Sequence, residues 1–476
     1  MGRPCYVVTS LLLLAAFTTG CTHKNQPLTH PKLRAGSSAV NQTRAALFIP
    51  IQPLAATTRP SIVDEILPLV APVSDNDGVF VGIAMSGGGS RSANFSAACL
   101  FQFEQLGLLQ KADYLSSVSG GSLTAAYYCL STDREWRPRN VQRRLAHSFA
   151  TDILINNLLP WNFLVLAFTD WDRSDLLADT LRKNLFSRDG KELTFADLRP
   201  NRPRLLINAT DLQTGKPFVF SNESFDKLGS DLGSYPIAHA VAASAAVPVL
   251  LHHVTVRDYS TAFKQYRHLI DGGVTDNLGI RTLTDLYNGQ IEAAKRAGAP
   301  NPYPRGAVFL VLDARTEFDA KLSDKADIGL AETLATGAGL TSTVLINRAS
   351  SATLSDIIVE HSPEDVTAGT LRRQKKELET KGHLQLKDSE GRPVYVVHLA
   401  LSRMDDMQDL PFASFRERVN SIATYFNISD TEAYHLYQAA ELLVTRKFDG
   451  PLREIARFVD GATATTAPTA APARDR

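Results

Sequence analysis

Two strand–glycine–helix corners within residues 78–130 constrain the fold more than any other part of the sequence. The first is an apolar strand over residues 78–86, followed by Gly87–Gly89 and an amphipathic helix. The second is a short apolar strand over residues 114–118, a tight turn at 119–121 and another helix. Alternation of strands and helices is typical of a parallel sheet, which usually binds its ligands beyond the carboxyl ends of its strands. We therefore expect an α/β fold with ligand-binding groups at both corners.

The second corner fits the nucleophile-elbow pattern Gly-x-Ser-x-Gly, except that Ser117 occupies the position of the first glycine. The pattern needs small residues on both sides of the nucleophile, so that the turn is tight and the hydroxyl is exposed above the sheet. Ser119 is the only serine of this corner with small residues at both flanking positions. Ser119 is therefore a candidate nucleophile, and a glycine-rich turn without chemistry is the alternative.

The three consecutive glycines of the first corner can turn their backbone N–H groups outward together and bind an anion at the helix start. A P-loop would require a Lys-Ser or Lys-Thr pair, and a dinucleotide fold an acidic residue about 20 positions further on. The sequence after Gly89 has neither at the required spacing. An oxyanion hole for acyl transfer fits better, because the candidate nucleophile lies next along the same edge.

A candidate base, Asp271, occurs much later in the chain. An apolar strand that begins at His268 ends in this carboxylate, and two glycines follow it. A partly desolvated carboxylate at the same edge of the sheet can accept the proton of Ser119 directly. The alternative interpretation is an ordinary Asp-Gly turn.

In this order and spacing, the three segments resemble the signature blocks of the patatin-like phospholipases. The blocks are Gly87–Arg91, Ser117–Gly121 and Asp271–Gly273, and segments 208–215 and 242–248 also resemble that family. The resemblance covers roughly residues 78–315 and is far more specific than any single block. It implies a three-layer α/β fold with a central, mostly parallel sheet flanked by helices. It also implies a serine acyl hydrolase that cleaves ester bonds of lipids with a Ser–Asp dyad and without a catalytic histidine, cofactor or metal.

The resemblance assigns a role to each matching residue. Ser119 would be the nucleophile and Asp271 the base. The oxyanion would be stabilised by backbone N–H groups of Gly87, Gly88, Gly89 and Gly120. Arg91 matches the basic residue that follows the family's glycines, and we favour a role in holding the loop over contact with a phosphate. Ser92 and Ser117 stand where the family usually has glycine.

The N-terminal residues predict export from the cytoplasm. Arg3 precedes an apolar run over residues 6–17 that is too short to span a bilayer, and small residues lead to Cys21. This arrangement resembles a bacterial lipoprotein signal in which Cys21 is lipidated, and Thr22 resembles the outer-membrane sorting pattern. We expect a protein of the bacterial cell envelope that is lipid-anchored, with the outer membrane favoured. Simple secretion is the alternative.

On this interpretation the chain has four parts: a signal peptide (1–20), a proline-containing tether (21–77), the acyl hydrolase domain (78–460) and a disordered tail rich in Ala, Thr and Pro (461–476). Within the domain, residues 320–460 form a helical extension. Further strands are expected at 205–210, 216–221, 307–313 and 394–401, and further helices at 236–247, 415–426 and 429–443. Asp313 ends one of the strands, where a solvated or structural role is expected. The most apolar stretch, 153–168, is either core or an acyl-chain channel or flap.

Composition excludes some classes of partner. The sequence has 50 basic and 50 acidic residues, so bulk charge does not support nucleic-acid binding, and membrane lipids are the expected partner. The basic run 372–376 is expected on a solvated helix face. Cys99 and Cys129 are expected as buried free thiols, and a disulfide between them in an oxidising compartment is the alternative. No cluster of metal-ligand type occurs in the sequence.

Two other functions compete with the Ser–Asp hydrolase. The first is an α/β-hydrolase esterase that uses Ser119, Asp271 and His398, which would lose its activity on replacement of His398. The second is a non-catalytic envelope lipoprotein that binds lipid on a degenerate hydrolase scaffold. Labelling of Ser119 by a serine-reactive phosphonate separates the enzyme from the binding protein.

Overall fold

The computed structural model describes residues 23–28, 77–149, 173–248, 251–261, 264–315, 353–359, 366–406, 413–422, 424 and 426–461. The predicted signal peptide, Cys21, most of the tether, the apolar stretch 153–168 and all but the first residue of the tail lie outside these ranges. Among the described residues, no helix combines the length and the apolar character needed to cross a bilayer.

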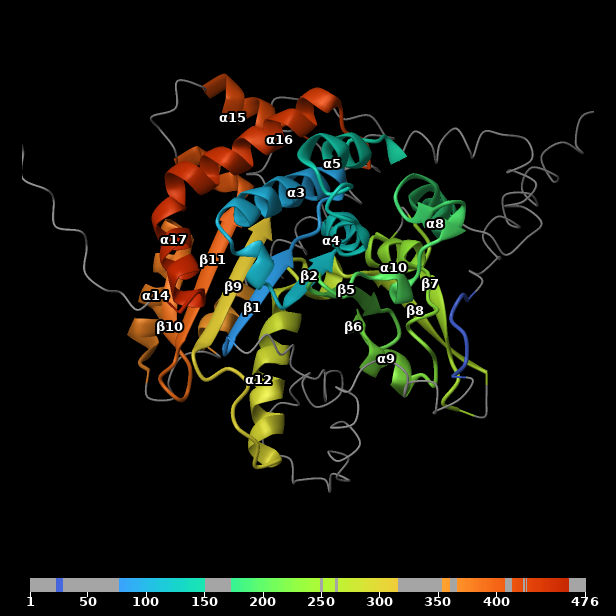
Figure 1. The fold of residues 1–476 in the computed structure, drawn as a ribbon, viewed down its shortest axis with the longest axis horizontal. Helices are drawn as coiled ribbons and strands as arrows, with labels where there is room; N and C mark the ends of the chain where they lie inside the picture. The colour runs from blue at the N-terminus through green and yellow to red at the C-terminus, as the bar shows by residue number, and fades with distance from the viewer. Residues whose placement is uncertain are drawn as a thin grey trace, which may run out of the picture.

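The described part of the chain is built around a nine-stranded mixed sheet (Figure 1). Its order is β10-β11-β9-β1-β2-β5-β8-β7, and β6 pairs with β5 on a side branch. The strands are β1 (Val79–Met85), β2 (Tyr114–Val118), β5 (Arg204–Asp211), β6 (Lys216–Phe220), β7 (Val254–Asp258), β8 (Gln265–Asp271), β9 (Gly306–Asp313), β10 (His383–Lys387) and β11 (Pro393–Ala400). The neighbouring strands β11, β9, β1, β2 and β5 run parallel, whereas β10, β6, β8 and β7 pair antiparallel.

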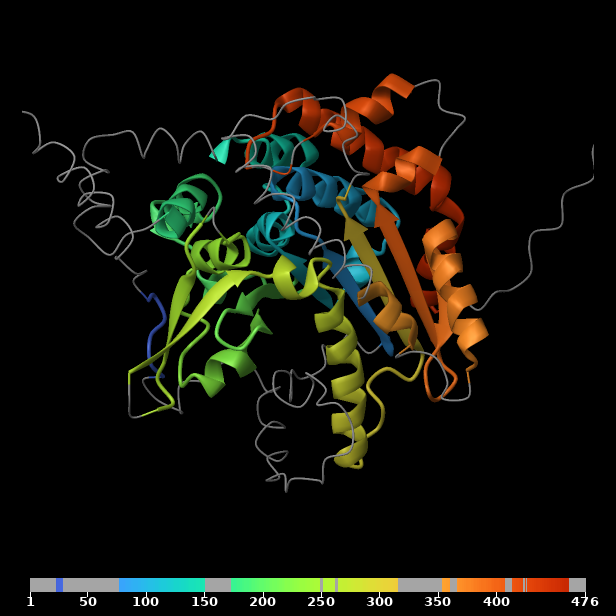
Figure 2. The ribbon, with the colours of Figure 1, turned by 180° about the vertical axis from the view of Figure 1, so that it is seen from behind.

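Helices cover both faces of this sheet, which confirms the predicted α/β class. One face carries α3 (Gly89–Gln105), α4 (Gly120–Leu130), α10 (Ile237–Ser244) and α16 (Asp430–Leu442), and the other carries α12 (Ile280–Arg296) and α14 (Ala368–Lys381) (Figure 2). Further elements are α5 (Pro138–Leu145), α8 (Arg173–Asn184), α9 (Asn222–Lys227), α11 (Gly273–Asp276), α15 (Ala413–Asn420), α17 (Asp449–Val459) and the hairpin of β3 (Ser187–Arg188) and β4 (Lys191–Glu192).

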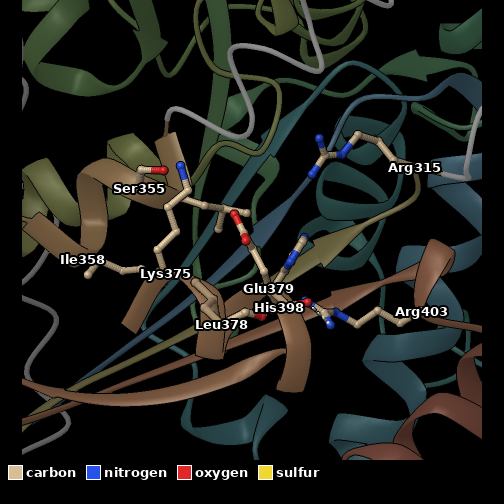
Figure 3. A pocket seen from close by; sticks show the side chains of 9 residues that line it. Arg315, Ser355, Ile358, Lys375, Leu378, Glu379, His398 and Arg403 are labelled. Atoms are coloured by element: carbon tan, nitrogen blue, oxygen red, sulfur yellow. Dashed lines mark hydrogen bonds between the residues drawn. The ribbon is translucent and has the colours of Figure 1, made fainter. Parts of the chain in front are cut away.

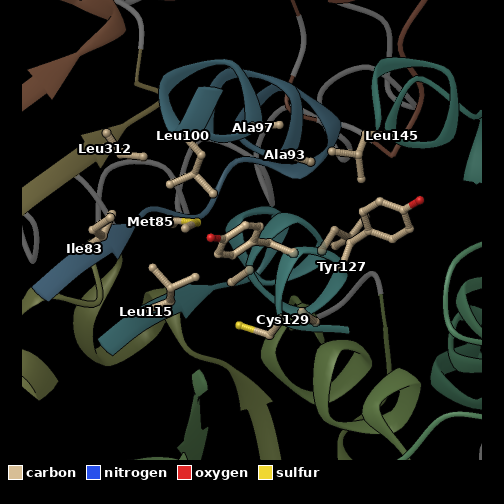
Figure 4. Close-up of a cluster of buried hydrophobic side chains, with 14 of the residues drawn as sticks. Ile83, Met85, Ala93, Ala97, Leu100, Leu115, Tyr127, Cys129, Leu145 and Leu312 are labelled. Carbon is tan, nitrogen blue, oxygen red and sulfur yellow. The ribbon is translucent and has the colours of Figure 1, made fainter. Parts of the chain in front are cut away.

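The central strand β1 shows why two helical layers are needed. All of its residues are buried, and successive side chains point to opposite faces of the sheet. Val79, Val81, Ile83 and Met85 join one hydrophobic cluster, and Phe80 and Ala84 join the other. Figure 4 shows Ile83 and Met85 packed with Leu100 of α3 and Leu115 of β2. A strand buried on both faces is typical of a parallel sheet between two helical layers.

The strands expected at 205–210, 216–221, 307–313 and 394–401 are confirmed as β5, β6, β9 and β11. The helix expected over 429–443 is confirmed as α16, which begins with a capping box in which Ser429 and Glu432 exchange hydrogen bonds. The helix expected over 415–426 is too long, since α15 ends at Asn420. Ile422 is nevertheless buried. The helical spacing of apolar residues therefore continues past the end of the helix into a loop.

Residues 320–460, expected as a helical extension, contribute sheet as well as helix, because β11 joins β9 in parallel and β10 joins β11 antiparallel at the edge of the sheet. The basic run 372–376 lies on α14, where Arg372, Arg373, Lys375 and Lys376 are exposed, as expected of a solvated face. At the other end of the sequence, residues 23–28 of the predicted tether lie against the domain. Asn25 is fully buried, with its side-chain amide donating to the carbonyl oxygen of Arg257 at 2.7 Å.

Candidate active site

Ser119 lies at the end of β2, directly before the first residue of α4. Its backbone has φ 50° and ψ −119°, and among the described residues only one other non-glycine residue, Asp189, has positive φ. A side chain held in this region of backbone space is strained and marks a position that the surrounding structure enforces. The predicted sharp turn at Ser119 is therefore present, with the serine 5% exposed.

The two glycine corners pack directly against each other. A Cβ atom at Gly120 would lie 2.0 Å from the carbonyl oxygen of Gly89, and one at Gly87 would lie 3.4 Å from Cβ of Ser119. Gly88 has φ 134° and Gly89 has φ 56°, conformations that glycine adopts readily. The glycine loop therefore lies beside the serine turn because no side chain separates the two backbones.

Gly87, which the sequence suggested for the oxyanion hole, has its backbone N–H occupied by another acceptor. Its backbone N–H donates to the carbonyl oxygen of Asn277 at 3.0 Å, so Gly87 anchors the loop to the segment before α12. Within the described chain, no hydrogen bond occupies the backbone N–H of Gly88, Gly89 or Gly120. Gly89 and Gly120 begin α3 and α4, whose first N–H groups have no partner inside a helix. These three amides remain as donors beside Ser119.

Asp271 ends β8 and is 5% exposed. The Ser119 hydroxyl donates a hydrogen bond to its carboxylate, and the backbone N–H of Gly273 donates to Oδ1 at 2.7 Å. Burial raises the pKa of the Asp271 carboxyl to about 6, although both of these hydrogen bonds act to lower it. The structure thus brings together the two candidate residues and gives the carboxylate the basicity that proton transfer near neutral pH requires.

The direction of β8 was not predicted, and it explains how Asp271 reaches the serine. β8 runs antiparallel to β5, with Asp271 paired to Ala209. β8 therefore begins beyond the carboxyl end of β5 and ends at Asp271, beside Ala209 of β5. Gly272 then passes so close to β5 that an added Cβ would lie 2.4 Å from the carbonyl oxygen of Asn208. The glycine after the base is needed for this close approach.

Arg91 lies in the first turn of α3 and is 8% exposed. Its Nη1 donates to the carbonyl oxygen of Ile422 at 2.8 Å, a contact that fits the structural role favoured from the sequence. Burial lowers the pKa of Arg91 to about 10, and the charge of Asp313 acts in the opposite direction. Cys99 and Cys129 are buried free thiols, as predicted, and burial raises the pKa of Cys129 to about 12.

His398 is not part of this site. Its Nε2 lies 2.9 Å from Oδ2 of Asp313, which also accepts from Arg315 Nε at 2.7 Å. Burial alone would raise the pKa of the Asp313 carboxyl, but the charge of Arg315 and the hydrogen bond from His398 outweigh it, so the pKa is well below its usual range. Asp313 is fully buried, so its predicted structural role fits and a solvated role does not.

The order of the strands excludes the Ser119, Asp271 and His398 triad. His398 is on β11 and Asp271 on β8, with β9, β1, β2 and β5 between them. Five strand spacings amount to about 24 Å, far beyond hydrogen-bond reach. His398 instead lines a pocket of about 150 Å³ with Arg315, Arg403 and residues of α14, and neither Ser119 nor Asp271 is part of that lining (Figure 3).

Two residues at the site were not singled out from the sequence. Ser244, at the end of α10, accepts the backbone N–H of Ser119 on its Oγ at 2.8 Å. Asn208, on β5, donates from its side chain to the carbonyl oxygen of Ser117 at 2.9 Å. Both lie in the segments 208–215 and 242–248 that resembled the family between its main blocks, which was the available signal. In the described part of the chain, no three His, Cys, Asp or Glu side chains converge as a metal site requires.

Residues 83–284 match the family model described as patatin-like phospholipase. This match spans both corners, the Ser119 turn and Asp271. The chain contains a patatin-like phospholipase domain. The match places the domain in a family of lipid acyl hydrolases. No curated protein matches the chain in a sequence search.

The chain is similar to solved structures that include human GIVD cytosolic phospholipase A2 and VipD from Legionella pneumophila. The human enzyme is 12% identical over 84% of this chain and 63% of its own, with a TM-score of 0.46. VipD is 13% identical over 77% of this chain and 67% of its own, with a TM-score of 0.28. The chain therefore spans less than two thirds of the length of the human protein.

Proposed function

We propose that the patatin-like domain hydrolyses carboxylic esters of lipids, phospholipids or lysophospholipids, with Ser119 as nucleophile and Asp271 as base. The observation that carries the proposal is the hydrogen bond from the Ser119 hydroxyl to the buried Asp271 carboxylate. A serine hydroxyl is a weak nucleophile unless an adjacent base takes its proton as it attacks. Asp271 is that base, and its raised pKa of about 6 fits the task near neutral pH.

In the first half-reaction, Oγ of Ser119 attacks the ester carbonyl carbon while its proton passes to Asp271. The carbonyl oxygen becomes an oxyanion, and the N–H groups of Gly88, Gly89 and Gly120 are available to stabilise it. The tetrahedral intermediate then collapses, the bond to the alcohol breaks, and Asp271 returns the proton to the leaving alkoxide. An acyl group remains on Ser119.

The second half-reaction releases the fatty acid. A water molecule gives its proton to Asp271 and attacks the acyl carbon, and the same amides stabilise the second oxyanion. The acyl bond to Ser119 breaks, and the proton on Asp271 returns to Oγ. Backbone amides that are already oriented toward the oxyanion contribute strongly to the rate, since loss of one such donor typically lowers it by about 10²- to 10³-fold.

A lipid substrate is supported by the family match and by the surface next to the site. Val274, three residues after Asp271, is 46% exposed, and Leu212, directly after β5, is 54% exposed. Large exposed aliphatic side chains beside a catalytic group suit contact with lipid, whereas scattered ones elsewhere on a surface need no explanation.

The test is hydrolysis of a panel of defined phospholipids, lysophospholipids and neutral glycerides by purified protein, with the products identified by mass spectrometry. We expect release of fatty acid by the native protein, and a loss of at least about 10³-fold in Ser119→Ala and in Asp271→Asn. Each variant is compared with the native protein by circular dichroism to confirm folding. Full activity in either variant would refute the dyad, and no release from any lipid would refute the hydrolase.

Membrane attachment through Cys21 is a further part of the proposal. The resemblance of residues 1–21 to a lipoprotein signal supports it. Residues 23–28 are docked on the domain, so an anchor at Cys21 would hold the domain close to the bilayer rather than on a long tether. We expect radioactive palmitate to label the native protein in bacterial cells and not Cys21→Ser, which would leave the membrane fraction. Labelling of both proteins, or of neither, would contradict the anchor.

A further inference from the structure

The hydroxyl of Ser244 connects the serine turn to the rest of the sheet. Because Ser119 has left-handed φ, its backbone N–H does not join a strand ladder or the helix that follows. That N–H donates to Oγ of Ser244 at 2.8 Å. Ser244 is fully buried, so no water competes for this contact. The strained turn is thus held from outside by one side-chain oxygen.

The donor and acceptor roles of this hydroxyl are fixed by its neighbours. Oγ of Ser244 lies 2.6 Å from the carbonyl oxygen of Asn208, which can only accept, so the single proton of Ser244 goes there. Oγ of Ser122, 3.1 Å away, must then donate to Ser244. Ser244 therefore donates one bond and accepts two, from Ser122 and from the Ser119 backbone, and no alternative arrangement satisfies all three contacts.

The same short segment also binds the base. The backbone N–H of Asp271 donates to the carbonyl oxygen of Ala246 at 3.0 Å, and that of Gly272 donates to the carbonyl oxygen of Ser244 at 3.2 Å. Residues 244–246 therefore contact Ser119 through a side chain and Asp271 through the backbone. The distance between the nucleophile and the base depends on this segment.

The acceptor of the Ser244 proton is itself held in place. The side-chain amide of Asn208 donates to the carbonyl oxygen of Ser117 at 2.9 Å, and its Oδ1 accepts from Thr282 of α12 at 2.6 Å. Asn208 therefore connects β2, β5 and α12 around the turn. A displacement of the serine turn would have to break this network, because every polar group in it already has its partner.

We infer that Ser244 is a positioning residue that holds Ser119 in register with Asp271. This inference rests on the proposed hydrolase, and it adds a residue that acts through the nucleophile without touching the substrate. Replacement of Ser244 by alanine removes this partner from three buried groups: the N–H of Ser119, the hydroxyl of Ser122 and the carbonyl oxygen of Asn208. The turn at Ser119 can then relax from its strained conformation and move Oγ away from the carboxylate.

Ser244→Ala is expected to lower kcat by about 10- to 100-fold with KM changed less than about twofold, because small misplacements of a reacting group have effects of this size. Ser131→Ala is the matched control. Ser131 directly follows α4, the helix that begins after Ser119, and is also buried. Its hydroxyl donates to the carbonyl oxygen of Tyr127 at 2.6 Å, at the end of α4 opposite to Ser119. We expect an unchanged kcat in Ser131→Ala when both variants are assayed at a temperature where they are folded. Equal losses of kcat would show an effect of stability alone and overturn the inference.

A double-variant comparison separates positioning from other roles. If Ser244 acts by holding Ser119 against Asp271, its loss has no further effect once the base is gone. The rate of Ser119 labelling by a fluorophosphonate in Ser244→Ala with Asp271→Asn should therefore equal that in Asp271→Asn alone. The inference would be contradicted if Ser244→Ala lowered the labelling rate of Asp271→Asn by the same factor by which it lowers the rate of the native protein.

Hydrogen exchange tests the same contact without any activity. Peptides that cover residues 114–121 should exchange amide hydrogen at least about tenfold faster in Ser244→Ala than in native protein, and no faster in Ser131→Ala. Unchanged exchange in Ser244→Ala would overturn the inference. If the native protein hydrolyses no ester but Ser244→Ala still shows the faster exchange, the proposed function is refuted and the structural role of Ser244 stands.

Discussion

Ser119 donates a hydrogen bond to Asp271, and the strands that lead to these two residues, β2 and β8, lie on opposite sides of β5. β2 runs parallel to β5 and β8 runs antiparallel, so the two side chains meet from opposite chain directions. This pairing buries a carboxylate whose main polar contacts are the nucleophile and one backbone N–H. Its elevated basicity follows from that environment.

The first prediction concerns pH. Burial raises the pKa of Asp271 to about 6, and only the deprotonated carboxylate can accept the proton of Ser119. We therefore expect kcat/KM to fall about tenfold for each pH unit below about 6 and to be constant above it. The measurement is kcat/KM against pH with a soluble p-nitrophenyl ester. A rising limb centred near the ordinary pKa of aspartate, about 4, would show a solvated base and contradict the geometry.

The second prediction concerns stability. Because the folded pKa of Asp271 is above the unfolded value, the folded protein binds more protons between about pH 4 and 6, and its stability falls as pH rises through that window. Asp271→Asn removes the cost of burying the charged carboxylate, which is about 3 kcal/mol for a pKa shift of about two units. We expect its Tm to exceed that of native protein at pH 8 and the difference to shrink towards pH 4. A Tm below that of native protein at pH 8 would contradict this account.

The third prediction concerns His398. His398→Ala removes a hydrogen bond to the buried charge of Asp313, so we expect a loss of about 2 kcal/mol in the free energy of unfolding. Ester hydrolysis should stay within about threefold of native at a temperature where the variant is folded. An α/β-hydrolase triad would instead lose about 10⁴-fold in kcat. Urea unfolding and initial rates on the same preparation decide between the two.

The fourth prediction concerns the contact between the corners. A methyl group at Gly120 would lie 2.0 Å from the backbone of Gly89, so Gly120→Ala should destabilise the protein by about 3 kcal/mol and abolish hydrolysis. Gly450→Ala is the control, because nothing lies within 4 Å of the added atom and the residue is in α17. We expect Gly450→Ala to be as stable as native protein or more so, and fully active. Tolerance of alanine at position 120 would contradict the packing of the glycine loop.

The two corners and most strands could be predicted from the sequence, because glycine turns and apolar runs are local signals. β10 was missed because Leu384 and Leu386 alternate with polar residues over only five positions. The direction of β8 was also missed, since a strand ending in Asp-Gly-Gly has the same local pattern whether it is parallel or antiparallel to its neighbour.

Contacts between residues that are far apart in the chain could not be predicted from the sequence. Gly87, Gly88 and Gly89 are identical residues in sequence, and only the position of Asn277 shows that the first of them has its N–H occupied. Likewise, Asp313 and Asp271 both end strands, and the neighbouring Arg315 and His398 make one a structural ion pair while the other stays poised as a base. Such differences depend on partners that only the fold brings together.

The most direct test of the Ser119 and Asp271 pair is the rate of covalent labelling by a fluorophosphonate, with the modified residue identified by peptide mass spectrometry. We predict a single adduct on Ser119, a labelling rate that falls below about pH 6, and a loss of at least about 10³-fold in Asp271→Asn. No adduct on the native protein, or an equal rate in Asp271→Asn, would contradict the claim that Asp271 activates Ser119.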